Sequence, residues 1–225
     1  MNELAVFAKY WQPGSVKTRL AADVGTVASS QIYRAMLDCT LKRFCEIGDR
    51  RVVTVTPAVR GGEFQQLAGT AWLIKSQIEG DLGARMEAHF NQSLRSGADR
   101  AVLIGSDSPT LPVEVIDTAF RLLREHQVVL GPSDDGGYYL IGLSNAIPPV
   151  FVDIDWSTAS VWQQTVDRLA AAGCSFAELP SWYDVDTMDD LKKLRLELCG
   201  SRFNAQFDEL SKAIDGISPQ TNCNA

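Results

Sequence analysis

The sequence has only two histidines, His89 and His126, and its five cysteines are an odd number spread far apart without a C-x-x-C pair. Structural zinc sites use four Cys or His ligands at close spacing, so the sequence argues against one. No Ser/His/Asp or Cys/His arrangement for nucleophilic catalysis is visible either. The cysteine pattern predicts buried or incidental thiols in a reducing cytoplasm.

Long apolar runs and positive charge are also scarce. No run approaches the ~20 residues of a membrane-spanning helix. The N-terminus lacks a basic segment followed by a long apolar stretch, so we expect no signal peptide. The net charge is −7 and the calculated pI is about 4.9. General nucleic-acid binding relies on a basic surface, so we expect neither nucleic acid nor an anionic membrane as a partner.

The familiar phosphate-binding motifs are missing: there is no G-x-x-x-x-G-K-[ST], and no G-x-G-x-x-G follows the first strand. Instead, the apolar run Leu4–Ala8 leads into a Pro-Gly turn in a loop with three cations, Lys9, Lys17 and Arg19. Ligands of open α/β sheets bind beyond the carboxyl ends of strands, so this loop is a candidate polyphosphate site. The alternative is a solvated loop whose charges bind nothing.

Strand and helix patterns alternate along the 225 residues, 45% of which are hydrophobic. This predicts one α/β domain with a mostly parallel sheet and right-handed crossovers. The exception is Val128–Leu143, where two strands lie too close for a helix and indicate a hairpin-like excursion or an antiparallel edge. We expect strands at Leu4–Ala8, Arg51–Thr56, Ala71–Lys75, Ala101–Gly105, Val128–Gly131, Tyr139–Leu143 and Ser175–Leu179, and helices at Thr26–Glu46, Gly62–Ala68, Leu82–Ser96, Pro112–Glu125, Ser157–Ala172 and Thr187–Leu198.

We assign the domain to residues 1–200 and a C-terminal helix and tail to residues 201–225. The composition becomes polar after Gly200. We expect one more helix within Ser201–Ile214 and a frayed end from Ser218 onward.

A single carboxylate, Asp107, follows the apolar central strand Ala101–Gly105. It is predicted at the same sheet edge as the cationic loop, where a carboxylate can hold Mg²⁺ together with phosphate oxygens and water. The alternative is that Asp107 or Ser106 caps the helix that begins near Pro112.

Two further carboxylates, Asp184 and Asp186, alternate on an extended segment and so can face the same side. Asp186 or Thr187 could instead cap the next helix. The turn Gly131–Tyr139 pairs two Asp with two Gly, which fits a hairpin turn or a close approach to a ligand. The glycines Gly80 and Gly83 at a helix start are explained if something packs on the backbone there.

In order, these segments resemble one family. The motifs are F-A-K-x3-P-G-x2-K-T-R-L, Q-x2-G-D-L-G-x-R-M, G-S-D-S-P, G-P-S-x-D-G-G-Y-Y-L-I-G-L and D-V-D-T-x2-D-L, between Leu4 and Leu198. The chain is similar to the bacterial glycosyltransferase-A-type nucleotide-diphospho-sugar transferase-like proteins, distant relatives of 2-phospholactate guanylyltransferase and the molybdenum-cofactor nucleotidyltransferases. The resemblance implies a three-layer Rossmann-like α/β fold with a mixed, mostly parallel sheet.

The resemblance also implies site residues. Lys17, Arg19 and Asp107 would be catalytic, and the metal, Mg²⁺ or Mn²⁺, would be held by Asp107 with Asp186 or Asp184, because Asp107 lacks a D-x-D partner. The nucleotide would contact Ala8, Lys9, Pro13, Gly14, Lys17, Arg19, Gln77, Gly80, Asp81, Gly83 and Arg85. The acceptor would border Asp135, Gly136, Gly137 and Tyr138.

Three functions follow as hypotheses. The first is Mg²⁺-dependent nucleotidyl transfer from an NTP to a small phosphorylated or anionic acceptor, in which Lys17 and Arg19 neutralise the leaving pyrophosphate. The second is glycosyl transfer from a nucleotide-diphospho-sugar, for which Asp134 or Asp135 could supply a base. The third is a non-catalytic nucleotide-binding protein. All three take a nucleotide as partner in the cytoplasm, and the first two also take a small-molecule acceptor.

Overall fold

A computed structural model describes residues 1–200 and 205–216. In this part of the chain, seven strands form one sheet in the order β3-β2-β1-β4-β6-β5-β7, and β6 runs antiparallel to both of its neighbours. The strands are β1 (Asn2–Lys9), β2 (Arg50–Thr56), β3 (Leu73–Ser76), β4 (Arg100–Ile104), β5 (Val128–Pro132), β6 (Tyr138–Ser144) and β7 (Phe176–Glu178). The predicted mixed, mostly parallel sheet is confirmed.

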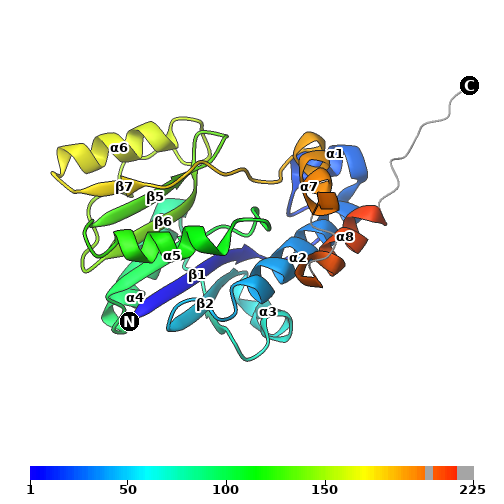
Figure 1. Cartoon of the computed structure of the whole chain (residues 1–225), viewed down its shortest axis with the longest axis horizontal. Coiled ribbons are helices and arrows are strands. Elements are labelled where there is room, and N and C mark those ends of the chain that lie inside the picture. The colour runs from blue at the N-terminus through cyan, green and yellow to red at the C-terminus, as the bar shows by residue number, and fades with distance from the viewer. Residues whose placement is uncertain (201–204, 217–225) are drawn as a thin grey trace, which may run out of the picture.

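Helices cover both faces of this sheet, which gives the predicted three layers (Figure 1). Side chains of α2, α3 and α5 pack on one face, and those of α4 and α6 on the other. The helical segments are α1 (Thr18–Val24), α2 (Thr26–Arg43), η1 (Ala58–Arg60), α3 (Gly61–Ala68), α4 (Leu82–Arg95), α5 (Val113–Leu122), α6 (Val161–Ala171), α7 (Met188–Gly200), η2 (Ala205–Phe207) and α8 (Asp208–Asp215).

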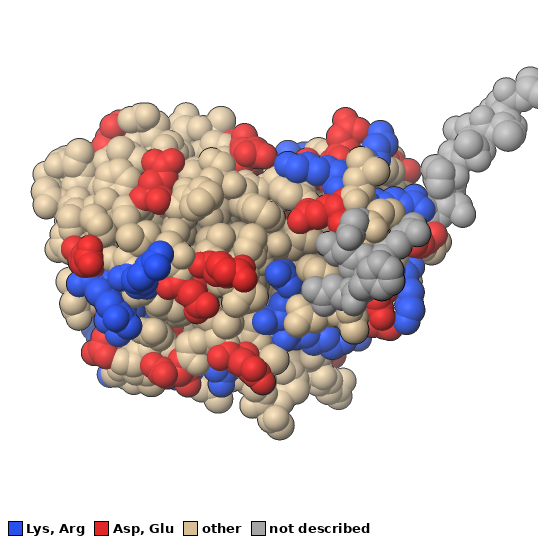
Figure 2. Space-filling view, in the orientation of Figure 1, with Lys and Arg blue, Asp and Glu red and all other residues tan. Residues whose placement is uncertain are grey.

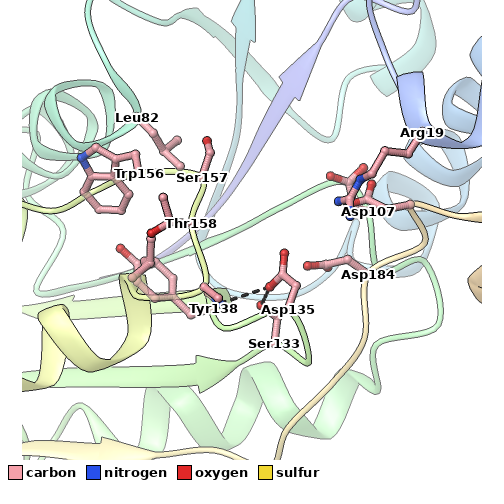
Figure 3. Close-up of a pocket in the computed structure, with 14 residues that line it drawn as sticks. Arg19, Leu82, Asp107, Ser133, Asp135, Tyr138, Trp156, Ser157, Thr158 and Asp184 are labelled. Carbon is pink, nitrogen blue, oxygen red and sulfur yellow. Dashed lines mark hydrogen bonds and ion pairs between the residues drawn. The ribbon is translucent and has the colours of Figure 1, made fainter.

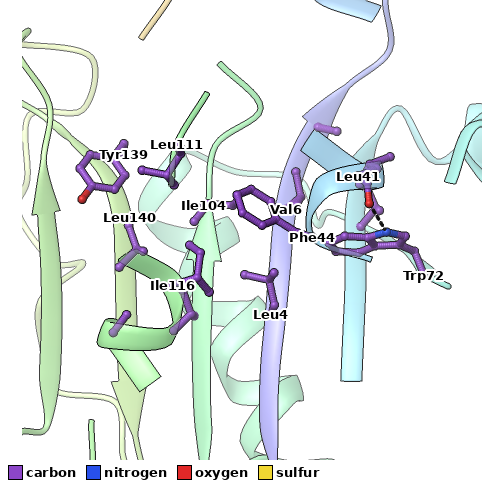
Figure 4. Close-up of a cluster of buried hydrophobic side chains, with 14 of the residues drawn as sticks. Leu4, Val6, Leu41, Phe44, Trp72, Ile104, Leu111, Ile116, Tyr139 and Leu140 are labelled. Atoms are coloured by element: carbon purple, nitrogen blue, oxygen red, sulfur yellow. Dashed lines mark hydrogen bonds between the residues drawn. The ribbon is translucent and has the colours of Figure 1, made fainter. Parts of the chain in front are cut away.

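The central strands are apolar on both sides because both faces are covered. In β1, Leu4 and Val6 point into the cluster under α2 and α5, while Ala5 belongs to the opposite cluster. Figure 4 shows the first cluster, where the Trp72 indole Nε1 donates to the Leu41 carbonyl at 3.0 Å. The buried Trp nitrogen thus finds an acceptor within the apolar layer.

The segment Val128–Leu143 is a hairpin, but it is not an edge of the sheet. Strand β6 lies between β4 and β5, with β7 beyond them. The prediction of a hairpin-like excursion is therefore confirmed, and the alternative of an antiparallel edge is wrong. The physical reason is that β6 is buried on both faces from Tyr139 to Ser144, as an interior strand requires.

The short helix α1 was not among the expected helices, and it begins directly after Lys17 in the cationic loop. A helix was expected within Ser201–Ile214, and α8 lies at Asp208–Asp215, where its Leu210 and Ile214 pack in a cluster with α1, α2 and α7. The division at residue 200 stays our proposal; it coincides with the end of α7, and the expected frayed end lies outside the described residues.

Charges of both signs are mixed over the face shown in Figure 2. Across residues 1–200 and 205–216, none of the helices combines the length and apolar character that crossing a membrane requires. The four described cysteines, Cys39, Cys45, Cys174 and Cys199, form no disulfide, and Cys223 lies outside the described part of the chain.

Candidate active site

Three segments meet at the carboxyl edge of the sheet: the ends of β1 and β4 and the extended stretch after β7. Backbone hydrogen bonds guide this stretch across the edge. The Leu179 N–H donates to the Leu130 carbonyl at 2.8 Å, and the Val185 N–H donates to the Asp107 carbonyl at 2.9 Å. Asp184 and Asp186, on either side of Val185, are thereby brought to Asp107.

The ammonium of Lys17 lies between two of the predicted metal ligands. Its Nζ is 2.6 Å from Asp107 Oδ1 and 2.7 Å from Asp186 Oδ1, and only 3% of its side chain is exposed. Burial alone would lower the pKa of Lys17, but the charges of Asp107 and Asp186 outweigh it, so the pKa is raised. Arg19, which is largely exposed, pairs with the other Asp186 oxygen.

Asp184 has a different environment from Asp186. It accepts a hydrogen bond from the Ser108 hydroxyl at 2.6 Å and makes no ion pair with a cation of residues 1–200 or 205–216. Burial, followed by the charge of Asp107, raises the pKa of Asp184 to about 7. Asp107 and Asp186 are therefore the pair that faces a cation, and Asp184 is the third carboxylate beside it.

The two capping alternatives have opposite outcomes. Helix α5 begins after Pro112 without a side-chain cap, so neither Ser106 nor Asp107 is used there. At α7, Asp190 Oδ2 accepts from the Thr187 N–H at 2.8 Å, and the Asp190 N–H donates to Thr187 Oγ1 at 3.3 Å. Thr187 and Asp190 thus form a reciprocal cap, which leaves Asp186 available to the site.

A pocket of about 420 Å³ opens on one side of Asp107 and Asp186. Of the residues predicted to contact nucleotide, Ala8, Lys9, Lys17, Gln77 and Arg85 line it. The Arg85 guanidinium donates to Gln77 Oε1 at 3.1 Å, and Gln77 Nε2 donates to the Thr54 carbonyl at 2.9 Å, which fixes both side chains at the pocket wall.

Six other residues predicted to contact nucleotide do not line this pocket, and one of them, Arg19, lines the second pocket described below. Pro13 and Gly14 are exposed on the loop after β1. Asp81 caps α4 by accepting from the Ala84 N–H at 2.8 Å. The Gly80 carbonyl accepts from Arg85 Nε at 2.9 Å, and Gly83 is buried under the Trp156 indole, where a Cβ would lie 2.6 Å from Nε1.

A second pocket of about 590 Å³ opens on the other side of the same carboxylates (Figure 3). Of the predicted acceptor residues, Asp135, Gly137 and Tyr138 line it, as does Arg19. Figure 3 shows Asp135 and Asp184 pointing toward one another from the β5–β6 turn and the segment after β7.

The turn between β5 and β6 is held by contacts on its far side. Gly136 has a φ of +89°, and a Cβ there would lie 2.4 Å from the Ala159 carbonyl oxygen. Its own carbonyl accepts from the Trp162 N–H at 2.9 Å, in the first turn of α6. Gly136 therefore joins the turn to α6, while its neighbours Asp135 and Gly137 face the pocket.

Sequence reasoning missed one wall of the second pocket. Trp156, Ser157 and Thr158 line it, together with Leu82 and Ser133. The segment was expected to begin a helix at Ser157, but α6 begins at Val161. The signal was the unexplained glycine pattern at the start of α4, since Gly83 leaves room for the Trp156 ring.

The donor set suits a hard divalent cation. Two carboxylates already converge on one positive centre, the Lys17 ammonium. Within the described ranges no group of three or more His, Cys, Asp or Glu side chains is arranged around a metal position. Mg²⁺ does not need such a group, because it commonly uses one or two carboxylates with phosphate oxygens and water.

Comparison with known proteins finds a curated relative and solved structures that are similar to this chain. The chain is 29% identical over 196 residues to a 3-phospho-D-glycerate guanylyltransferase from Phenylobacterium zucineum (strain HLK1), which spans 83% of this chain and 87% of that protein. It is 32% identical to a crystal structure from Desulfovibrio desulfuricans G20, provisionally named a nucleotide-diphospho-sugar transferase, with a TM-score of 0.87 over 96% of this chain and 97% of the other.

A third protein shares the fold alone. It comes from Mycobacterium tuberculosis H37Rv and was solved in complex with manganese, with 17% identity and a TM-score of 0.51 over 86% of this chain and 96% of that one. The chain is thus nucleotidyltransferase-like, and the predicted transferase class and fold family are confirmed.

A model of one bacterial family matches residues 42–158, more than half of the sequence, including the G-S-D-S-P motif and the glycine turn. The chain belongs to the family described as uncharacterized protein conserved in bacteria, DUF2064.

Proposed function

We propose that the protein catalyses Mg²⁺-dependent nucleotidyl transfer from an NTP to a small phosphorylated or anionic acceptor. One observation carries this proposal: the two pockets meet at Asp107 and Asp186, which line both. A nucleotide in the 420 Å³ pocket and an acceptor in the 590 Å³ pocket would meet at these carboxylates. The guanylyltransferase name of the curated relative supports the same reaction class.

The positively and negatively charged residues of the site would have separate roles. Lys17 and Lys9 on the nucleotide side would pair with phosphate oxygens, and Arg19 would face the acceptor's negative charge. Asp107 and Asp186 would hold the divalent cation, which when bound neutralises phosphate charge and orients the reacting phosphoryl group. A phosphate or carboxylate acceptor is already ionised, so no protein base needs to remove its proton. A cytoplasmic location is part of this proposal, since NTPs are available there.

The test uses each of the four NTPs labelled at the γ-phosphate, with Mg²⁺ or Mn²⁺, against a panel of phosphorylated hydroxy acids that includes 3-phosphoglycerate. Nucleotidyl transfer releases labelled pyrophosphate only when an acceptor is present. Absence of pyrophosphate with every nucleotide and acceptor would contradict this function. The metal requirement is tested separately by adding EDTA.

Glycosyl transfer is the second candidate, favoured by the name of the 32% identical structure. In that reaction the bond breaks on the sugar side of the diphosphate, and the Asp135 carboxylate in the acceptor pocket could accept the proton of an attacking hydroxyl. Turnover of nucleotide-diphospho-sugars with release of the nucleoside diphosphate, and no pyrophosphate from any NTP, would decide for it.

A further inference from the structure

Lys17 is held in an unusual way for a surface-loop lysine. Its backbone has a φ of +49°, in the left-handed region that residues other than glycine rarely adopt. Its side chain is almost fully buried, although lysine is rarely buried unless paired. Both costs persist only where the surrounding structure holds the residue, and here two carboxylates do so.

The ion pairs around Lys17 balance in charge without a metal. Asp107 and Asp186 carry two negative charges, and Lys17 and Arg19 supply two positive ones. Asp184 lies beside this group and accepts a hydrogen bond from Ser108. A divalent cation entering alone would add two positive charges beside Lys17 and Arg19, which is unfavourable. A nucleotide triphosphate arriving with the metal supplies further negative charge.

Lys17 is the cation that can move in response. Its ammonium sits on a flexible four-carbon stem and lines the nucleotide pocket as well as the carboxylate pair. Arg19 pairs with Asp186 and lines the acceptor pocket instead. When phosphates occupy the nucleotide pocket, Lys17 has an alternative anionic partner on the same side.

We propose that Lys17 is a resident counter-ion that occupies the position of the divalent cation between Asp107 and Asp186, and that a metal–nucleotide complex displaces it toward the phosphates. The metal alone then binds weakly, because it competes with a tethered ammonium. Nucleotide and metal bind with positive coupling, because the phosphates remove that competitor. This inference rests on the proposed function only for the nature of the second ligand.

The test measures Mn²⁺ binding by electron paramagnetic resonance in the protein without nucleotide. The parent and Lys17→Met are compared, with Lys42→Met as the control, because Lys42 is an exposed lysine of α2 that pairs with Asp38 and lines neither pocket. We expect Lys17→Met to bind Mn²⁺ about tenfold more tightly than the parent, and Lys42→Met to match the parent. An unchanged or weaker Mn²⁺ affinity of Lys17→Met overturns the inference.

The variant's stability provides a second readout. Lys17→Met leaves two carboxylates facing one another without their shared cation. In EDTA, its thermal midpoint should therefore be lower than that of the parent. Addition of Mn²⁺ should raise the midpoint of Lys17→Met by more than it raises that of the parent. Lys17→Arg retains the charge and should retain the parent's small response. If Mn²⁺ fails to raise the midpoint of Lys17→Met beyond the parent's shift, the counter-ion role is refuted.

Nucleotide binding separates this inference from the proposed function. Adding a non-hydrolysable NTP should increase the parent's Mn²⁺ affinity and increase that of Lys17→Met by a smaller factor. A parent protein that binds no nucleotide would contradict the proposed function, while the titration without nucleotide still decides the role of Lys17.

Discussion

The Val185 N–H donates a hydrogen bond to the Asp107 carbonyl at 2.9 Å. This bond ties the strand-like segment after β7 to the end of the central strand β4. It positions Asp186 so that its carboxylate and that of Asp107 share the Lys17 ammonium. The candidate metal pair is thus built by backbone pairing across the sheet edge rather than by a local D-x-D motif.

Removal of one carboxylate from this pair should abolish turnover. Asp107→Asn keeps the shape of the side chain but loses the charge that a divalent cation needs. We expect the transferase rate to fall by at least about a hundredfold, since even indirect partners of metal ligands commonly cost 10–100-fold. Asp189→Asn is the control, because Asp189 is exposed and pairs with Lys192. Equal rates for the two variants would contradict the role of Asp107.

Gly83→Ala should disturb the wall of the acceptor pocket. The added Cβ would lie 2.6 Å from Trp156 Nε1, so the indole must shift. We expect a loss of about 1–3 kcal/mol in the free energy of unfolding and a raised acceptor KM. Gly62→Ala, where a Cβ has open space in α3, should be neutral or stabilising by up to about 1 kcal/mol. Urea denaturation measures both, and an unaltered Gly83→Ala protein would show that Trp156 is not held there.

The two pockets should respond to different substitutions. Trp156→Ala removes an aromatic wall of the 590 Å³ pocket, and Arg85→Ala removes a cation from the 420 Å³ pocket. We expect Trp156→Ala to raise KM for the acceptor and Arg85→Ala to raise KM for the nucleotide, each by several-fold. Steady-state kinetics with each substrate varied in turn provides the measurement. A reversed pattern would exchange the assignments of the pockets.

Asp184 should make stability fall with rising pH. Its pKa is about 7 in the folded protein, against an ordinary value of 3.8. Between these values the folded protein binds more protons at this carboxyl than the unfolded chain, so its contribution to stability is full below pH 3.8 and declines up to about pH 7. Each unit of pKa difference corresponds to about 1.4 kcal/mol.

Asp184→Asn cannot titrate and should remove this decline. Urea unfolding in EDTA at pH 5.0 and pH 7.5 compares the two proteins, so that contributions from all other groups cancel. We expect the parent to lose more stability than the variant between the two pH values. Parallel behaviour of the two proteins would show that Asp184 ionises normally in the folded state.

The sequence predicted the sheet well because its central strands are apolar on both faces and its helices carry the 3.6-residue period. It could not place β6 inside the sheet, since a buried hairpin and a buried parallel strand have the same apolar pattern. It also missed α1, which begins at Thr18. The preceding residue, Lys17, has a positive φ, and nothing in the sequence indicates that a lysine adopts this conformation.

The segments that form the site were predicted more accurately than the individual residues that line it. The carboxyl ends of parallel strands share an edge, so Lys17 and Asp107 were expected together. Other predicted residues do not line the pocket because they have structural roles instead. Asp81 caps α4, and Gly83 leaves room for the Trp156 ring. The Asp81 cap is local, whereas the contact between Gly83 and Trp156 joins segments that are distant in the sequence, and motif spacing cannot show such a contact.

The most direct test of the central claim is the anomalous scattering of Mn²⁺ in crystals grown with a non-hydrolysable NTP. The account predicts one manganese peak between the Asp107 and Asp186 carboxylates, with the phosphates in the 420 Å³ pocket and the Lys17 ammonium moved onto them. Manganese bound elsewhere, or a nucleotide bound away from these carboxylates, would contradict it.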